Sequence, residues 1–223
     1  MCGIIAVLRR SSRRAAPTAD SLRALLTAAE LAFTGDRGPR GLTACAEALD
    51  RLDRELRGVP GLWTLLHDRA LAAALATGAQ RLHEIVTAFE GSLDATAGQA
   101  EGDAGIEARN QALVRVKDAL WAVQRDRLPH AEGVRTLAGS EFPHQSTAAS
   151  FSSVQVALDA LDRLEVRGRD SAGVSVIVSG IDPNDAWLRS LRADRELDPL
   201  FQNGSVRVAD GCLNFVYKHA AEI

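Results

Sequence analysis

The residue best suited to chemistry stands at the start of the chain, where Cys2 follows the initiator methionine. Removal of that methionine, which is normal before a small residue, would give Cys2 a free α-amine beside its thiol. The α-amine titrates at roughly pH 8, so it is a useful base near neutrality, and a thiolate is a strong nucleophile. One residue would then supply nucleophile and general base. A lone cysteine fits equally well as a small buried side chain that opens a strand.

A second motif favours the catalytic interpretation of Cys2 over the structural one. Residues 164–173 read Leu-Glu-Val-Arg-Gly-Arg-Asp-Ser-Ala-Gly. The opening Met-Cys-Gly-Ile and this motif, in this order, resemble the class II glutamine amidotransferases, the N-terminal-nucleophile group with the motif Arg-Gly-x-Asp-Ser-Ala-Gly. The Leu-Glu pair most resembles glutamine:fructose-6-phosphate amidotransferase, which makes glucosamine 6-phosphate. Amidophosphoribosyltransferase, the alternative, usually has Gln-His at that place.

The resemblance implies a role for three residues. Cys2 would attack the side-chain amide of glutamine, form a glutamyl thioester and release ammonia. Arg167 and Gly168 match the Arg-Gly of the family, whose arginine lies beside the nucleophile and shapes the glutamine pocket. A guanidinium near the thiol would favour the thiolate. Without the motif, Arg167 would be interpreted as an arginine at a helix C-terminus. Asp170 is interpreted as structural, and Gly173 as permitting close packing where a strand begins.

The later motifs of the family are missing. No tryptophan follows an arginine, so the Arg-Trp stretch that grips the glutamine carboxylate is absent. Asn203-Gly204 has the letters of the oxyanion-hole motif but not its context, and it is interpreted as a hairpin turn. Loss of one oxyanion donor typically lowers a rate by about 10²–10³. The sugar-phosphate isomerase domain is also absent. We therefore expect the N-terminal part of a longer enzyme, without glutaminase activity as this isolated chain.

The elements that must position these residues follow from the apolar pattern. The run from Gly3 to Leu8 predicts a buried strand, followed by a basic, solvated loop to Pro17. Four amphipathic helices are predicted between Thr18 and Arg127. Their apolar positions include Leu22–Phe33, Leu42–Leu56 capped by Gly58, Leu82–Phe89 closed by Gly91, and Ile106–Val123 stopped by Pro129. The stretch from Gly91 to Gly105 is predicted to be a mobile connector.

The last third of the chain changes character. Residues 152–155, Ser-Ser-Val-Gln, have the spacing of a capping box before a helix that runs to Leu164. Val174–Ser179 predicts a strand ended by Gly180 and Pro183. Val206 and Val208 follow the Asn-Gly turn, and a helix is predicted from Tyr217 to Ile223.

The predicted fold is therefore α+β: an incomplete N-terminal-nucleophile-hydrolase (αββα) glutaminase fold with a large all-helical insertion. Residues 1–16 and 150–223 would form a partial glutaminase domain, and residues 17–149 the insertion. Antiparallel hairpins let the ends of such an insertion lie close together. A non-catalytic interaction module built on a remnant catalytic fold is the alternative from another class.

The composition and charge of the chain limit the classes of partner that it is expected to bind. The net charge is −3, which gives no reason to expect nucleic acid, and charges interrupt every apolar run before a membrane-spanning length. Three cysteines and five scattered histidines match no disulfide framework or metal-binding pattern, so no metal and no cofactor are predicted. The predicted partners are glutamine, a sugar phosphate at an isomerase domain outside this chain, and a second copy through the full-length enzyme. The basic run follows the apolar one, unlike a signal peptide, which predicts a cytoplasmic protein.

Overall fold

The computed structural model describes residues 4–10, 12–95, 103–139, 142–164, 171–182, 184–202 and 204–220. They form a mostly helical α+β fold with a small three-stranded antiparallel sheet, which confirms the predicted class. The chain divides into two compact units, one of Met1–Leu8 with Val156–Ile223 and one of Arg9–Gln155. Each unit is described by itself.

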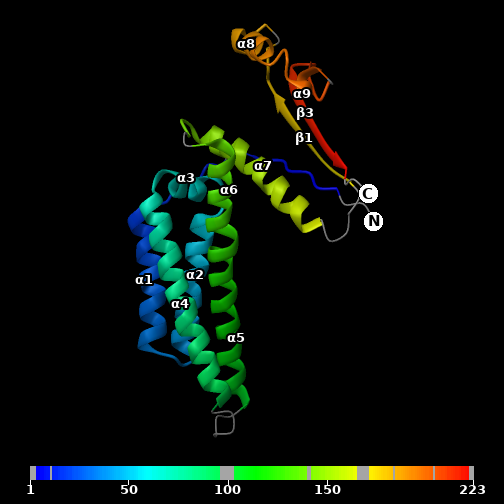
Figure 1. The fold of residues 1–223 in the computed structure, drawn as a ribbon. Helices are drawn as coiled ribbons and strands as arrows, with labels where there is room; N and C mark the ends of the chain where they lie inside the picture. The colour runs from blue at the N-terminus through cyan, green and yellow to red at the C-terminus, as the bar shows by residue number, and fades with distance from the viewer. Residues whose placement is uncertain are drawn as a thin grey trace. The chain divides into compact units, whose positions relative to one another are not determined.

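The larger unit is a helical bundle. In Figure 1 its four longest helices run side by side, and a short helix lies across one end. Its elements are α1 (Ala19–Gly35), α2 (Pro39–Leu56), α3 (Gly58–His67), α4 (Arg69–Ala95), α5 (Asp103–Trp121), the π-helix η1 (Ala122–Arg127), α6 (Leu128–Ala138) and the first half of α7 (Gln145–Leu164). The backbone stays helical from α5 through η1 into α6, so these three form one rod.

The first two predicted helices are confirmed with their core faces. Leu22, Leu26 and Phe33 of α1 are buried, and so are all five predicted positions of α2 from Leu42 to Leu56. Leu and Phe at these spacings fall on one side of a helix, so their burial removes one apolar stripe from water. Gly58 has a φ of 70°, the left-handed conformation that ends α2 and lets α3 begin at once.

Two predicted helix ends are wrong. α4 runs through Gly91 to Ala95, because a glycine alone lowers helix stability by only about 1 kcal/mol and does not end a well-packed helix. Residues 103–105, predicted as part of the connector, are helical as well. Pro129 does not end its helix either: it occupies the first turn of α6, directly after η1.

The π-helix explains how the rod passes Pro129. A proline in a helix lacks an N–H group and its ring meets the carbonyl four residues earlier. In η1 the Leu128 N–H instead donates to the carbonyl of Val123, five residues earlier. This wider turn relieves the conflict directly before the proline. The sequence alone indicates a helix end at Pro129, because no pattern in it marks the π-helical turn.

The smaller unit contains the sheet. β1 (Ser171–Ser179), β2 (Val206–Ala209) and β3 (Cys212–Ala220) are antiparallel, in the order β1-β3-β2, with Val174 opposite Tyr217 and Val208 opposite Leu213. Figure 1 shows β1 and β3 side by side along their length. Two short helices, α8 (Ala186–Asp194) and α9 (Pro199–Gln202), lie between β1 and β2 in the chain. The predicted strand at Val174–Ser179 is confirmed, and Gly180 ends it with a φ of 78°.

The sheet has little core of its own. Among the described residues of this unit, Leu188 and Leu213 are the buried apolar side chains. Ile177, Val178 and Tyr217 are exposed, although β-branched and aromatic side chains on a sheet are normally covered on at least one face. The described part of this unit is therefore a sheet with uncovered apolar surface.

Three further predictions for the chain ends are wrong. Ile4–Leu8 belong to no strand, and Ile4 and Leu8 are almost fully exposed. The segment from Tyr217 to Ala220 is strand rather than helix, because it pairs with the start of β1. The hairpin turn of the sheet is not Asn203-Gly204 but Asp210-Gly211, which joins β2 to β3 and has positive φ at both residues. Gly204 instead follows α9. Asn203 and Pro183 lie outside the described residues.

The predicted capping box is also wrong. Ser152 lies inside α7, which begins seven residues earlier at Gln145 and continues to Leu164. The predicted helix itself is confirmed. Ser152 lies in the interior of this helix, so its side chain has a role other than capping.

Candidate functional site

The three predicted site residues, Cys2, Arg167 and Gly168, lie outside the described residues, and so does Asp170. The structure describes the segments that lead to them. Ile4–Arg10 follow Cys2, α7 ends at Leu164, and β1 begins at Ser171.

Gly173 lies where the motif enters β1. A Cβ atom added there would stand 3.2 Å from the carbonyl oxygen of Tyr217 on β3 and 3.6 Å from Cγ of Lys218. The first distance is tighter than ordinary side-chain packing, so a glycine lets the two strands approach at this point. This agrees with the close packing predicted for Gly173.

A polar cluster around the buried Ser152 joins the beginning and the end of the larger unit. Nη2 of Arg9 donates to Oγ of Ser152 at 2.7 Å, across 143 residues of sequence. Nε2 of His130 lies 2.8 Å from the same hydroxyl. Ser152 is only 1% exposed, and partial burial of the Arg9 guanidinium lowers the pKa of that arginine from its usual value. A buried hydroxyl needs such partners, so α6, α7 and the N-terminal segment are held together here.

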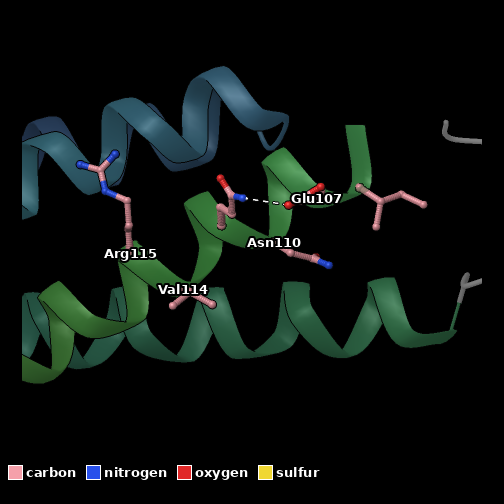
Figure 2. Close-up of a pocket in the computed structure, with 6 residues that line it drawn as sticks. Glu107, Asn110, Val114 and Arg115 are labelled. Carbon is pink, nitrogen blue, oxygen red and sulfur yellow. Dashed lines mark hydrogen bonds between the residues drawn. The ribbon is translucent and has the colours of Figure 1, made fainter. Parts of the chain in front are cut away.

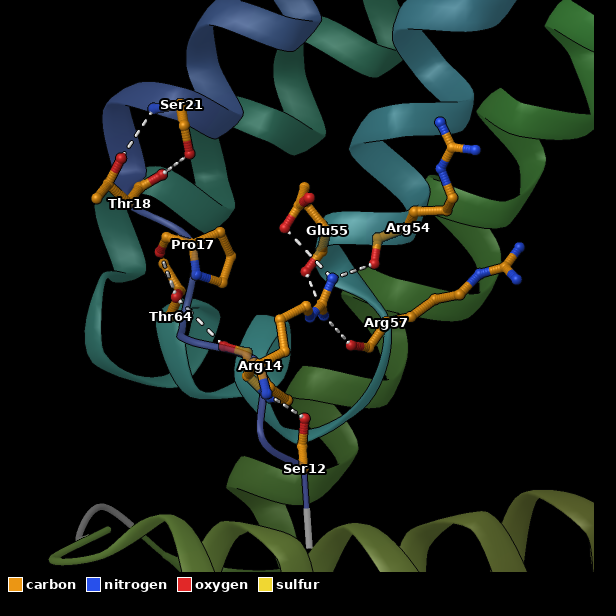
Figure 3. Close-up of polar contacts among 10 residues, drawn as sticks. Ser12, Arg14, Pro17, Thr18, Ser21, Arg54, Glu55, Arg57 and Thr64 are labelled. Atoms are coloured by element: carbon orange, nitrogen blue, oxygen red, sulfur yellow. Dashed lines mark hydrogen bonds and ion pairs between the residues drawn. The ribbon is translucent and has the colours of Figure 1, made fainter.

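The segment after Arg9 is anchored too (Figure 3). The guanidinium of Arg14 donates to the carbonyl oxygens of Arg54 and Glu55 at 2.7 and 3.0 Å, and to that of Arg57. Arg54 and Glu55 lie in the last turn of α2 and Arg57 is its C-cap residue, so the guanidinium supplies donors where the helix runs out of its own. Oγ1 of Thr64 on α3 donates to the carbonyl of Pro17 at 2.7 Å. The predicted basic loop is therefore irregular in structure but fixed to the bundle.

The pair of Ser152 and His130 has the spacing of a nucleophile and its base. Its burial excludes that chemistry, because a substrate cannot reach a hydroxyl that is 1% exposed. The arginine that donates to the same oxygen gives the hydroxyl a structural partner instead. We assign the cluster to the joining of chain segments. Sequence reasoning missed it because hydrogen bonds over 22 and 143 residues leave no local pattern.

The described residues contain neither a metal-binding cluster nor a membrane-spanning helix. No group of three or more histidine, cysteine, aspartate or glutamate side chains there is arranged to hold a metal ion. Nor does any described helix have the length and apolar character needed to cross a membrane.

Comparisons with protein-family models, with curated proteins and with solved structures returned no match to this chain. The assignment of a function therefore rests on the two sequence motifs and on the geometry of the segments that carry them.

Proposed function

We propose that the chain carries the glutaminase site of a class II glutamine amidotransferase, with Cys2 as the nucleophile and Arg167 and Gly168 in the glutamine pocket. The Leu-Glu pair before Arg167 favours an enzyme that makes glucosamine 6-phosphate from fructose 6-phosphate and glutamine. The N-terminal-nucleophile-hydrolase fold and a cytoplasmic location are parts of the same proposal.

The observation that carries the proposal is the contact between Arg9 and Ser152. In the amidotransferases that the motifs resemble, the Arg-Gly motif follows the cysteine after about one helix of chain, whereas here more than 140 residues intervene. The hydrogen bond brings the chain back, after the whole bundle, to the segment that leads from Cys2. α7 then continues towards Arg167. This contact supports the proposal, because an insertion needs its entry and its exit close together.

The chemistry follows from the residue types. The Cys2 thiolate would attack the side-chain carbonyl carbon of glutamine, and the oxygen would take the negative charge. Collapse of this intermediate breaks the C–N bond, and the leaving nitrogen takes a proton from the α-ammonium of Cys2 to depart as ammonia. Water then hydrolyses the thioester, giving glutamate and the free thiol. Arg167 would stabilise the thiolate and help to orient glutamine.

The uncovered sheet is compatible with this reading. An αββα fold covers each sheet with a second sheet on one face and with helices on the other, so isolated strands of such a fold keep apolar side chains exposed. Ile177 and Tyr217 are exposed in this manner.

Selective alkylation of Cys2 tests the proposal. A diazoketone analogue of glutamine is incubated with the full chain; the thiol displaces dinitrogen and forms a thioether, which peptide mass spectrometry locates. We expect the adduct on Cys2 and competition by glutamine. The other cysteines are internal controls: Cys45 is buried, and burial raises the pKa of its thiol to about 12. Cys212 is half-buried in β3.

Arg167→Ala should slow the labelling, whereas Arg169→Ala, at the variable position of the motif, is the matched control. Labelling of Cys2 no faster than Cys212, or unaffected by glutamine, would refute the site. Because the carboxylate clamp and the oxyanion motif are missing from this sequence, steady ammonia release by the chain alone is expected to be absent. Steady release that Cys2→Ala abolishes would show that other residues replace those motifs.

A further inference from the structure

β1 lies at one edge of the sheet, and nothing in its sequence protects that edge. Its nine residues pair with β3 without a bulge. The order β1-β3-β2 leaves the other side of β1 without a partner strand among the described residues. The strand contains no charged residue and no proline. Edge strands normally carry lysine, proline or a bulge, because an unprotected edge pairs with another strand. β1 is therefore open to the addition of a strand.

The hydrogen bonds of the sheet show which groups of β1 face this edge. The N–H of Val216 on β3 donates to the carbonyl of Ser205, directly before β2, at 2.8 Å. The N–H and C=O groups of Val216 therefore point away from β1. Successive residues of a strand alternate in this direction, so Phe215 and its partner Val176 bond to each other. On β1 the N–H and C=O groups of the odd-numbered residues then point outward, to the free edge.

Exposed apolar side chains alone would not identify a partner. Ile106 and Val114, for example, line a hollow of about 610 Å³ on α5 (Figure 2), but the backbone of that helix already bonds within itself. A free strand edge differs, because its outward N–H and C=O groups fix the direction and the register of an added strand. The side chains of β1 then decide which strand fits.

The sequence of β1 is complementary to a second copy of itself. Ser171, Ser175 and Ser179 stand at its two ends and its centre, so these positions coincide when the strand is reversed. In an antiparallel pair of two copies centred on Ser175, every outward N–H and C=O group of one copy lies opposite an outward group of the other. Registers centred on other residues leave part of these groups unpaired. The backbone therefore favours this one register.

The side chains agree with this register. On one face Val174 lies opposite Val176 of the second copy, and β-branched pairs of this kind stabilise neighbouring strands. On the other face Ile177 lies opposite Gly173 of the second copy. Ile177 is 66% exposed in the single chain, and a glycine opposite leaves room for its side chain. No like charges meet, because β1 has no charge.

We propose that two copies of this chain pair antiparallel through β1, centred on Ser175, and so join their three-stranded sheets into one sheet of six strands. The uncharged strand fits its own copy better than an acidic or basic partner. Cys2, Arg167 and Gly168 take no part, so this homodimer interface is independent of the proposed glutaminase site.

Sedimentation equilibrium of the full chain, from low micromolar to several hundred micromolar, tests the interface. The wild-type chain should form a dimer. Ile177→Pro removes an outward N–H from each copy but no hydrogen bond to β3, and it should raise the dimer dissociation constant about tenfold or more. Ile177→Val is the matched control. It keeps that N–H and a β-branched side chain, so its dissociation constant should stay within about threefold of the wild-type value.

A cysteine at the centre of β1 tests the register. In a hydrogen-bonded antiparallel pair the two Cα atoms lie about 5.5 Å apart, which a disulfide can bridge. Ser175→Cys should therefore give a disulfide-linked dimer when oxidised glutathione accepts the two electrons, and peptide mass spectrometry should locate the bond between the two introduced cysteines. Ile177→Cys is the control. Its two copies would lie four residues apart along the strands, roughly 14 Å, and should not be linked to each other.

Circular dichroism should show every variant folded, and the cysteine variants test the interface even if Ile177→Pro does not fold. A wild-type chain that stays monomeric throughout the concentration range, as when another segment of the same chain occupies the edge, would overturn the proposal. So would a dimer that Ile177→Pro leaves unchanged. A dimer that Ser175→Cys fails to link, or that Ile177→Cys links equally well, would show that β1 does not pair in this register and would overturn it too.

Discussion

Removal of the buried carboxylate of Asp53 is expected to destabilise the bundle more than any change to its surface ion pairs. Asp53 lies on α2 and is almost fully buried. Its Oδ1 accepts from Nε of Arg127 at 2.8 Å, and its Oδ2 from Nε of Arg57 at 2.8 Å and from the same guanidinium's Nη2. Arg127 comes from η1, so this carboxylate joins α2 to the π-helical turn.

The loss of unfolding free energy in each variant depends on how well the remaining partner is hydrated when its ion pair is broken. The Arg127 side chain is 26% exposed and the Arg57 side chain 60%. An exposed arginine returns to water, so Arg57→Ala should cost below about 1 kcal/mol. Arg127→Ala removes a charged hydrogen bond at a buried acceptor, about 2 kcal/mol. Asp53→Ala leaves both cations without their acceptor and should cost about 3–5 kcal/mol, the range for breaking a buried pair.

Urea unfolding followed by circular dichroism measures these differences. Asp50→Ala is the matched control, because Asp50 is on the same helix and pairs with Arg115 on the surface; it should cost at most about 1 kcal/mol. The reasoning fails if Asp53→Ala costs no more than Asp50→Ala. It also fails if Arg57→Ala costs more than Arg127→Ala, since burial would then not govern the energies.

Three further changes test other parts of the bundle. Gly41→Ala should lower the free energy of unfolding in urea by more than about 1–3 kcal/mol, because the new Cβ would lie 1.8 Å from a main-chain oxygen. Gly91→Ala, whose Cβ would have nothing within 4 Å, should raise it by up to about 1 kcal/mol. Burial raises the pKa of Cys45 from 9.0 to about 12, so the folded state favours the protonated thiol. Stability should therefore fall above about pH 9, by at most about 1.4 kcal/mol per pH unit, and Cys45→Val should flatten that decline in pH-dependent melts. Ser152→Ala leaves two polar partners without their hydroxyl and should cost about 1–3 kcal/mol, against almost nothing for the exposed Ser150→Ala; equal costs would contradict its joining role.

The helices of the bundle were predictable where an apolar stripe and a helix-ending residue agreed. α1 and α2 follow their stripes, and Gly58 ends α2 as its backbone freedom allows. The stripe on α5 predicted its buried face from Leu113 to Val123, whereas Ile106, predicted on the same stripe, is exposed. What failed was the weight given to single residues. Gly91 lies inside α4 because one glycine lowers helix stability by only about 1 kcal/mol, and Pro129 lies inside the rod because the π-helical turn before it accommodates its ring.

The chain ends were less predictable because strands depend on partners that are distant in sequence. The apolar run at Ile4–Leu8 has the composition of a strand but pairs with nothing among the described residues, whereas the segment at Tyr217, whose pattern also suits a helix, pairs with β1. The Arg9–Ser152 contact was invisible for the same reason. Cys2 and Arg167 were found by their motifs, and their arrangement remains a prediction.

The hydrogen bond between Arg9 and Ser152 also has a consequence for the evolution of a chain with a bundle at this place. Loop-closure entropy depends on the distance between the ends of an inserted segment, and a folded insert whose ends already touch constrains its host little more than a short turn. The bundle could therefore be gained, lost or exchanged in one genetic event without a change in the segments that lead to Cys2 and to Arg167. If the bundle is an insertion, as proposed, a gene in which a short linker replaces the segment between Arg9 and Ser152 would encode the minimal form of the protein.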